Sequence, residues 1–183
     1  MSKVKKLPSQ EYLNECFSYN KETGSLTWKK RPNHHFVSKH LQDSTNTRFE
    51  SKEAGSVFVS RGQKRSMIWI SGERFYKQRI IWKLVTGKDP LRDIDHEDTN
   101  TLNNVWSNLR EADDHQNSCN RNKRKDNTSG YKGVQLRKES GRYRAIITAK
   151  GETIHLGHFG TKEEAAKAYM EANIKLHGEF SRI

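Results

Sequence analysis

The stretch IDHEDTNTLNNVWSNLREADDHQN, residues 94–117, determines the fold of the first part of the chain. An apolar residue leads into Asp95 and His96, and a long polar segment follows them. Two apolar side chains then bracket Asn108. This succession predicts a buried strand, a polar loop and a helix that begins near Glu111.

The residue types in this stretch suit hydrolysis of a phosphodiester bond. That reaction needs a base to deprotonate water and a divalent cation to stabilise charge on the phosphate and the leaving oxygen. His96 suits the role of base, because the ordinary pKa of histidine is about 6.5. Asp95 and Asn117 offer the hard oxygen ligands that Mg²⁺ accepts. The amide of Asn108 can hold the loop and the imidazole in place. A single His beside an Asp is nevertheless more often a surface pair than a catalyst.

The spacing of His96, Asn108 and Asn117 resembles the three signature positions of HNH endonucleases, in the variant whose last member is Asn. The likeness spans residues 75–121 and points to the phage and intron-encoded group of that family. It implies a ββα-metal fold that binds one Mg²⁺ or Mn²⁺ ion. The family roles place the metal on Asp95 and Asn117, the general base at His96 and a structural amide at Asn108. The alternative is a degenerate domain without catalysis.

The segment ahead of the motif departs from many relatives at one position. Those relatives carry a His before the Arg, whereas this chain has Gln78 before Arg79. The missing His is not one of the three signature residues, so the core chemistry is still expected. Arg79 either clamps the scissile phosphate by a charge-assisted bond or forms a structural ion pair.

Residues 129–183 have the pattern of a second, smaller module. Three runs with β-type alternation cover residues 130–137, 142–149 and 153–159, with turns between them. Thr161 and Glu164 then form a capping-box pattern at the start of a helix with an apolar face that includes Leu176. The whole chain is therefore predicted to be α+β, with β-hairpins and a ββα-metal domain followed by a three-stranded antiparallel sheet packed on one helix.

This module resembles the plant APETALA/ethylene-response-factor DNA-binding domain. The resemblance rests on residues 129–134, 142–147, 156–159 and 161–169. It implies that the sheet lies in the major groove of double-stranded DNA while the helix backs it. Plant members have Arg and Trp where this chain has Gln135 and His155, so the plant target sequence is not carried over. The expected DNA-facing residues are Lys132, Gln135, Arg137, Arg142, Arg144, Thr148, Thr153 and His155.

The first 75 residues are less informative. Residues 11–17 have the pattern of a short amphipathic helix, and Gly24 lies between two short β-type runs that predict a hairpin. The polar residues 33–53 are predicted to form a flexible loop. They contain His34, His35 and His40, but no nearby Cys or His completes a metal site, so no structural zinc is expected.

Composition supports a nucleic-acid partner. The chain of 183 residues has 34 basic and 22 acidic side chains, a net charge of +12, and only 32% hydrophobic residues. Such a balance suits a polyanionic partner and argues against one large core. Because no membrane span or secretory signal is evident, and two distant cysteines make no disulfide framework, we expect a cytoplasmic protein.

These observations predict a domain organisation and a function. We expect a nuclease domain at residues 1–119, a basic linker at 120–128 and a DNA-binding domain at 129–183. The predicted function is site-directed DNA cleavage, of the homing or nicking type, by a monomer or weak dimer. The alternative is a DNA-binding regulator with a degenerate nuclease domain.

Overall fold

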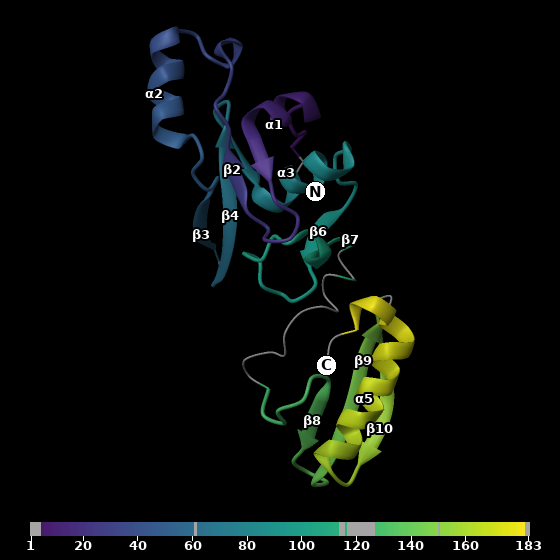
Figure 1. Cartoon of the computed structure of the whole chain (residues 1–183). Helices are drawn as coiled ribbons and strands as arrows, with labels where there is room; N and C mark the ends of the chain where they lie inside the picture. The colour runs from purple at the N-terminus through teal and green to yellow at the C-terminus, as the bar shows by residue number, and fades with distance from the viewer. Residues whose placement is uncertain (1–4, 61, 114–115, 117–126, 150, 182–183) are drawn as a thin grey trace. The chain divides into compact units, whose positions relative to one another are not determined.

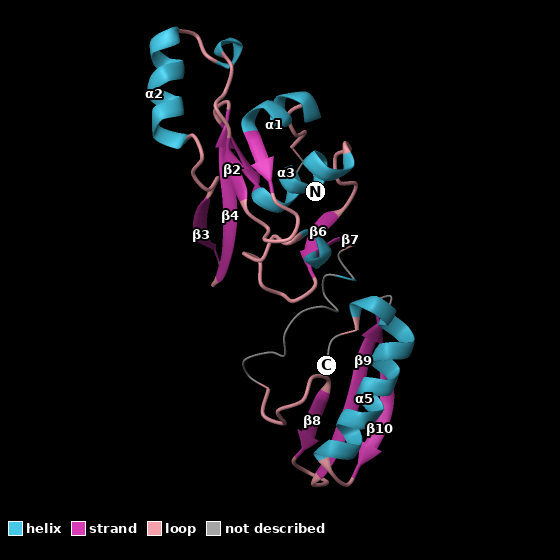
Figure 2. Cartoon of the chain, in the orientation of Figure 1, coloured by secondary structure: helices cyan, strands magenta, loops and turns pink. Residues whose placement is uncertain are grey.

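The computed structural model describes residues 5–60, 62–113, 116, 127–149 and 151–181 (Figure 1). The chain divides into two compact units, Met1–Glu111 and Ala112–Ile183. Both mix helices with small antiparallel sheets, which confirms the α+β prediction (Figure 2). Among the described residues, no helix is long and apolar enough to cross a membrane.

The first unit begins with a helix, a two-stranded hairpin, a second helical segment and a three-stranded meander. Its elements up to the nuclease-like segment are α1 Gln10–Cys16, β1 Phe17–Tyr19, β2 Leu26–Trp28, η1 Asn33–His35, α2 Lys39–Phe49, β3 Ser56–Ser60, β4 Gln63–Ile70 and β5 Glu73–Tyr76. β1 pairs antiparallel with β2, and β3, β4 and β5 form a meander in that order. The predicted first helix and the hairpin around Gly24 are therefore confirmed.

The prediction of a flexible loop over residues 33–53 is wrong. Most of this segment forms η1 and α2, and α2 begins at a proper N-cap, because the Ser38 hydroxyl accepts from the N–H of Leu41. The helix buries polar side chains: Gln42 and Asn46 both donate to the carbonyl of Arg31. Because the buried side chains of α2 are amides, its sequence lacks the apolar repeat from which a helix is predicted.

The nuclease-like segment completes the first unit. It consists of α3 Lys77–Thr86, β6 Asp93–His96, η2 Trp106–Asn108 and β7 Leu109–Ala112. β6 and β7 form a two-stranded sheet, so Glu111 itself lies in a strand. The helix predicted to begin near Glu111 falls mostly outside the described residues; Gln116, which is described, is helical. Ile80 and Ile81 of α3 are fully buried with Ile68 of β4, and each such side chain contributes about 1.5–3 kcal/mol of burial free energy.

The second unit is a sheet backed by one helix. Its elements are β8 Val134–Arg137, β9 Arg142–Ala149, β10 Glu152–Phe159, α5 Lys162–His177 and η3 Gly178–Phe180, and the strand order is β10-β9-β8. The capping box of Thr161 and Glu164 is present, as predicted. On α5 the buried positions include Asn173, whereas Leu176 is 42% exposed, so its predicted place on the buried face is wrong.

Candidate active site and nucleic-acid interface

His96 ends strand β6 and its side chain is buried, with 3% of the residue exposed. Its Nε2 lies 3.3 Å from Oδ1 of Asn104. Asn104 uses its own N–H₂ to donate to the carbonyl of Leu102 at 3.1 Å, which leaves Oδ1 as the acceptor. Nε2 of His96 therefore carries the proton, and Nδ1 is the basic nitrogen of the neutral ring.

Burial lowers the pKa of His96 below its ordinary value. The hydrogen bond to Asn104 and the charges of Asp95 and Asp98 act in the opposite direction but do not cancel that effect. The imidazole is consequently neutral at physiological pH, which is the form that can accept a proton.

Asp95 lies beside His96 in the chain but pairs with a cation from the neighbouring strand. Its Oδ2 accepts from both Nε and an Nη of Arg110, each at 3.2 Å. The two side chains are only 12% and 16% exposed, so solvent screens this pair little. The ion pair holds the Asp95 carboxylate, whose oxygens are potential ligands for a hard cation, next to the candidate base His96.

Asn108 closes the loop that follows His96. Its side-chain oxygen accepts from the N–H of Asp98 at 2.9 Å, and its N–H₂ donates to the Asp98 carboxylate at 3.0 Å and to the carbonyl of Asn103 at 2.8 Å. Its main-chain carbonyl accepts from Glu97. Asn108 thus holds the loop, while the amide that reaches the imidazole is that of Asn104.

The hairpin β1–β2 supports the same loop from the other side. The Tyr19 hydroxyl donates to the carbonyl of Asn104 at 2.7 Å, and the N–H of Trp106 donates to Lys21 at 3.0 Å. Gly24 makes this approach feasible: it has φ +72°, and a Cβ there would lie 2.5 Å from the backbone of Asn104.

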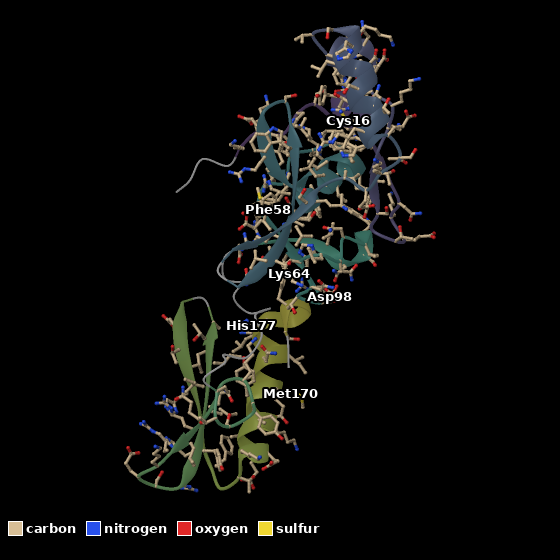
Figure 3. The ribbon with its side chains drawn as sticks, turned by 90° about the vertical axis from the view of Figure 1, so that its left-hand side faces the viewer. Cys16, Phe58, Lys64, Asp98, Met170 and His177 are labelled. Carbon is tan, nitrogen blue, oxygen red and sulfur yellow. The ribbon has the colours of Figure 1, made fainter. Side chains whose placement is uncertain are left out.

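The tip of the hairpin β3–β4 also contacts this loop. The hydroxyl of Thr101 donates to the carbonyl of Lys64. Figure 3 shows Lys64 and Asp98 at the same end of the first unit. The loop after His96 is therefore bonded to the β1–β2 hairpin and to β4.

The remaining predicted nuclease residues lie in two places. Arg79 of α3 donates to the carbonyls of Arg92 and Pro90 at 3.3 and 3.4 Å, and so ties α3 to the segment that leads into β6. Gln78 precedes it in the first turn of α3 and is half-buried. Asn117, the second predicted metal ligand, lies outside the described residues.

Seven of the eight predicted DNA-facing residues, all but Lys132, lie on one face of the sheet of the second unit. The register of the three strands pairs Gln135 with Arg144, Arg137 with Arg142, Thr148 with Thr153, and His155 with Ile146. Arg144 donates to the Gln135 side chain at 2.7 Å, and the two Thr hydroxyls lie 3.4 Å apart. Lys132 is half-buried and lies just before β8. Opposite them, Ala145 and Ile147 are buried, Ala145 against α5.

Sequence reasoning missed three residues that shape the active site. Asn104 contacts the imidazole, Asp98 anchors Asn108, and Arg110 pairs with Asp95. The density of Asp and Asn between residues 98 and 108 was a signal that this loop binds itself through side chains. It did not indicate which amide would reach His96.

Comparison with known proteins agrees with this geometry. A family model of HNH endonucleases matches residues 75–119, and a model of the AP2 domain matches residues 129–179. Protein 3.8 of Escherichia phage T7 is 37% identical over 118 residues, which make up 62% of this chain and 97% of that protein. The uncharacterized HNH endonuclease L560 of Acanthamoeba polyphaga mimivirus is 41% identical over 105 residues, 56% of this chain and 54% of that protein. No solved structure matches the chain.

These matches identify a nuclease-type protein and imply DNA as its partner. The chain belongs to the HNH endonuclease family and carries an AP2 domain in its carboxy-terminal part. Both resemblances drawn from the sequence are thereby confirmed.

Proposed function

We propose that this protein is a site-directed DNA endonuclease in which His96 is the general base and one divalent metal ion, Mg²⁺ or Mn²⁺, assists. The observation that carries the proposal is the buried, neutral imidazole of His96, whose Nε2 lies 3.3 Å from Oδ1 of Asn104. Water that attacks a phosphodiester would transfer its proton to the unprotonated nitrogen of this ring, while Asn104 keeps the ring from turning.

The metal ion would be held by Asp95 and Asn117. The donor chemistry of the described ligand fits a hard cation, because Asp95 is a carboxylate with little exposure beside the base. When bound, the ion stabilises negative charge on the phosphate and the leaving oxygen. Two protein ligands are few, so the ion would stay largely hydrated and bind at roughly millimolar concentration.

Arg79 and Asn108 would have supporting roles. Asn108 holds the loop after His96 through its contacts with Asp98, and it acts through position rather than through contact with substrate. Arg79 already has two carbonyl acceptors from the segment before β6, and we propose that it presents its remaining N–H groups to the phosphate.

The second unit would choose the site on double-stranded DNA. Its face combines guanidinium, amide and hydroxyl groups in cross-strand pairs, and such groups bond both phosphates and base edges in the major groove. The chain would act as a monomer or weak dimer in the cytoplasm of its host cell. One active site per chain favours nicking, and a homing-type double-strand cut would require two chains.

The test is cleavage of a supercoiled plasmid library by the purified full-length protein, with Mg²⁺, with Mn²⁺ and with EDTA. We expect nicked or linear product only with metal. His96→Ala should lose about 10²–10⁴ in rate while it retains affinity for DNA. His40→Ala, which removes an exposed His in α2, is the matched control and should cut normally.

Two results would decide against the proposal. Wild-type cleavage by a folded His96→Ala would remove this residue from the role of base. DNA binding without any cleavage, in either metal, would favour the alternative of a regulator with a degenerate nuclease domain.

A further inference from the structure

Three potential metal ligands meet where the end of α1 faces η1. Nε2 of His34 lies 3.0 Å from Oε2 of Glu15, and Nε2 of His35 lies 2.6 Å from the same oxygen. The ligand atoms of all three side chains lie within 4.8 Å of one another. Glu15 is 19 and 20 residues away in sequence, which is why the pattern around His34 offered no third ligand.

The ring of His35 is held in a fixed orientation. Its side chain is 1% exposed and stacks on Tyr12, with the ring centroids 4.2 Å apart and the planes 20° apart. Nδ1 lies 3.6 Å from Sγ of the buried Cys16. A metal-binding imidazole commonly has its second nitrogen held by another group in this way. Nε2 of His35 is therefore aimed at Glu15 before any ion arrives.

The other side of the cluster is open to solvent. The side chains of Glu15 and His34 are 42% and 65% exposed. An ion could enter from this side, and water could complete its coordination. The first of these ligands comes from α1 and the other two from η1, so an ion would link two segments that are separate in the sequence.

We propose that Glu15, His34 and His35 form a Zn²⁺ site separate from the active site, with water as the fourth ligand. Two imidazoles and one carboxylate suit Zn²⁺, whereas Mg²⁺ prefers oxygen ligands alone. Zinc bonds of about 2.0–2.1 Å in a tetrahedron place neighbouring ligand atoms about 3.3 Å apart. The two separations from Glu15, 3.0 Å to His34 and 2.6 Å to His35, are about 0.3 and 0.7 Å shorter, and a movement of the exposed Glu15 side chain by less than about 1 Å would accommodate the ion.

Such an ion would stabilise the first unit rather than take part in cleavage. The polar helix α2 begins a few residues after η1, and it is anchored by amide contacts of Gln42 and Asn46 with the carbonyl of Arg31 and, at its far end, by Phe49 against Trp28. A link from η1 to α1 would hold the start of this helical segment against the core that contains Leu13 and Cys16. Because ion binding favours the folded state alone, it would raise the stability of the unit.

The experiment compares the full-length protein with His34→Ala and His40→Ala. His34 is exposed, so its removal should leave the fold intact, and His40 is an exposed His outside the cluster. Each protein is stripped with EDTA, dialysed against Zn²⁺ and analysed for bound zinc. Thermal unfolding is then followed with and without Zn²⁺. Any zinc that binds at the active site or elsewhere is common to the three proteins and cancels.

We expect the wild type and His40→Ala to hold one more zinc per chain than His34→Ala. At free zinc of about 100 times the dissociation constant, their unfolding equilibrium constant should fall about 100-fold, and His34→Ala should lose this shift. Glu15→Gln, which keeps a hydrogen-bond acceptor but loses the charged ligand, should behave as His34→Ala does. Equal zinc content and equal shifts in all variants would show a hydrogen-bonded Glu–His cluster only, and would overturn the proposal.

Discussion

Asn108 and Asp98, ten residues apart in sequence, hold each other through a reciprocal pair of hydrogen bonds. The amide oxygen of Asn108 accepts from the N–H of Asp98 at 2.9 Å, and its N–H₂ donates to the carboxylate of Asp98 at 3.0 Å. This pair closes the loop that carries Asn104, the partner of His96. The signature Asn of the motif thus supports the base indirectly, through the loop.

Replacement of Asn108 by Ala should therefore lower both stability and cleavage. Three side-chain hydrogen bonds are lost, each with a net value of about 1 kcal/mol, and partial replacement by water should leave a loss of about 1–2 kcal/mol. Urea unfolding measures the first effect and plasmid cleavage the second. Ser107→Ala, an exposed neighbour in η2, is the control. Normal cleavage by Asn108→Ala would show that the loop does not position His96.

The carboxylate of Asp98 should make stability depend on pH. Burial by itself would raise its pKa, but hydrogen bonds from Asn103, the N–H of Asn100 and Asn108 outweigh that effect and lower the pKa below the ordinary 3.8. As pH falls, Asp98 is therefore protonated in the unfolded chain before it is protonated in the folded protein. The stabilisation of the fold by the Asp98 carboxylate is present above pH 3.8 and is lost below it.

Asp98→Asn should remove this dependence. The variant should be less stable than the wild type at pH 7, and the difference should shrink as pH falls through the acid range. Urea unfolding of both proteins at several pH values gives the difference directly. Asp93→Asn, an exposed carboxylate at the start of β6, controls for the general loss of negative charge. A difference that stays constant with pH would contradict the assigned role of Asp98.

The sequence predicted the candidate site as far as residue types and spacing allow. His96 and Asn108 stand out because their spacing resembles a known motif. Asn104 could not be singled out, because Asn100, Asn103 and Asn108 are also asparagines and lie in the same polar stretch of sequence. Only the path of the loop, set by Tyr19 and Lys21 of a distant hairpin, decides which amide meets the imidazole.

The fold was predictable where burial follows a simple period. In β9 the buried residues Ala145 and Ile147 alternate with side chains of the other face, and the predicted strand agrees with the structure. The same logic failed for α2, which buries Gln42 and Asn46. It failed on α5 as well, where Asn173 is buried and Leu176 is exposed. In each failure a polar side chain is buried at a position that apolar periodicity does not mark.

Gly133 should be irreplaceable in the second unit. A Cβ there would lie 2.2 Å from the ring of Tyr169, which packs beneath it on α5, and 2.6 Å from the carbonyl of Ile146. Gly133→Ala should cost about 1–3 kcal/mol beyond the strain of a positive φ, since the ring must move. Gly141→Ala shares a positive φ but meets nothing within 4 Å, so it isolates the packing effect. Equal thermal unfolding midpoints for the two variants would contradict this contact.

The last prediction separates site choice from cleavage. Arg142 and Arg144 lie on the outer face of β9, paired across the sheet with Arg137 and Gln135. If this face meets DNA, Arg142→Ala with Arg144→Ala should weaken binding. Loss of each phosphate contact should reduce the slope of log K against log salt by about 0.9. If an Arg reads a base edge instead, preference at that position should relax by about 1–3 kcal/mol.

The matched control is Lys167→Ala with Lys175→Ala, which removes the same charge from exposed positions of α5, the layer behind the sheet. Mobility shifts of both double variants on cognate and scrambled duplexes, at several salt concentrations, give the slopes and the specificity. Because the first unit keeps His96 and Asp95, the arginine variant should still cut at high protein concentration, but at scattered sites. If the lysine variant loses as much affinity and site preference as the arginine variant, only overall charge matters and the sheet does not read DNA. If cleavage itself disappears with the arginine pair at saturating protein, the two arginines act in the chemistry and not in site choice.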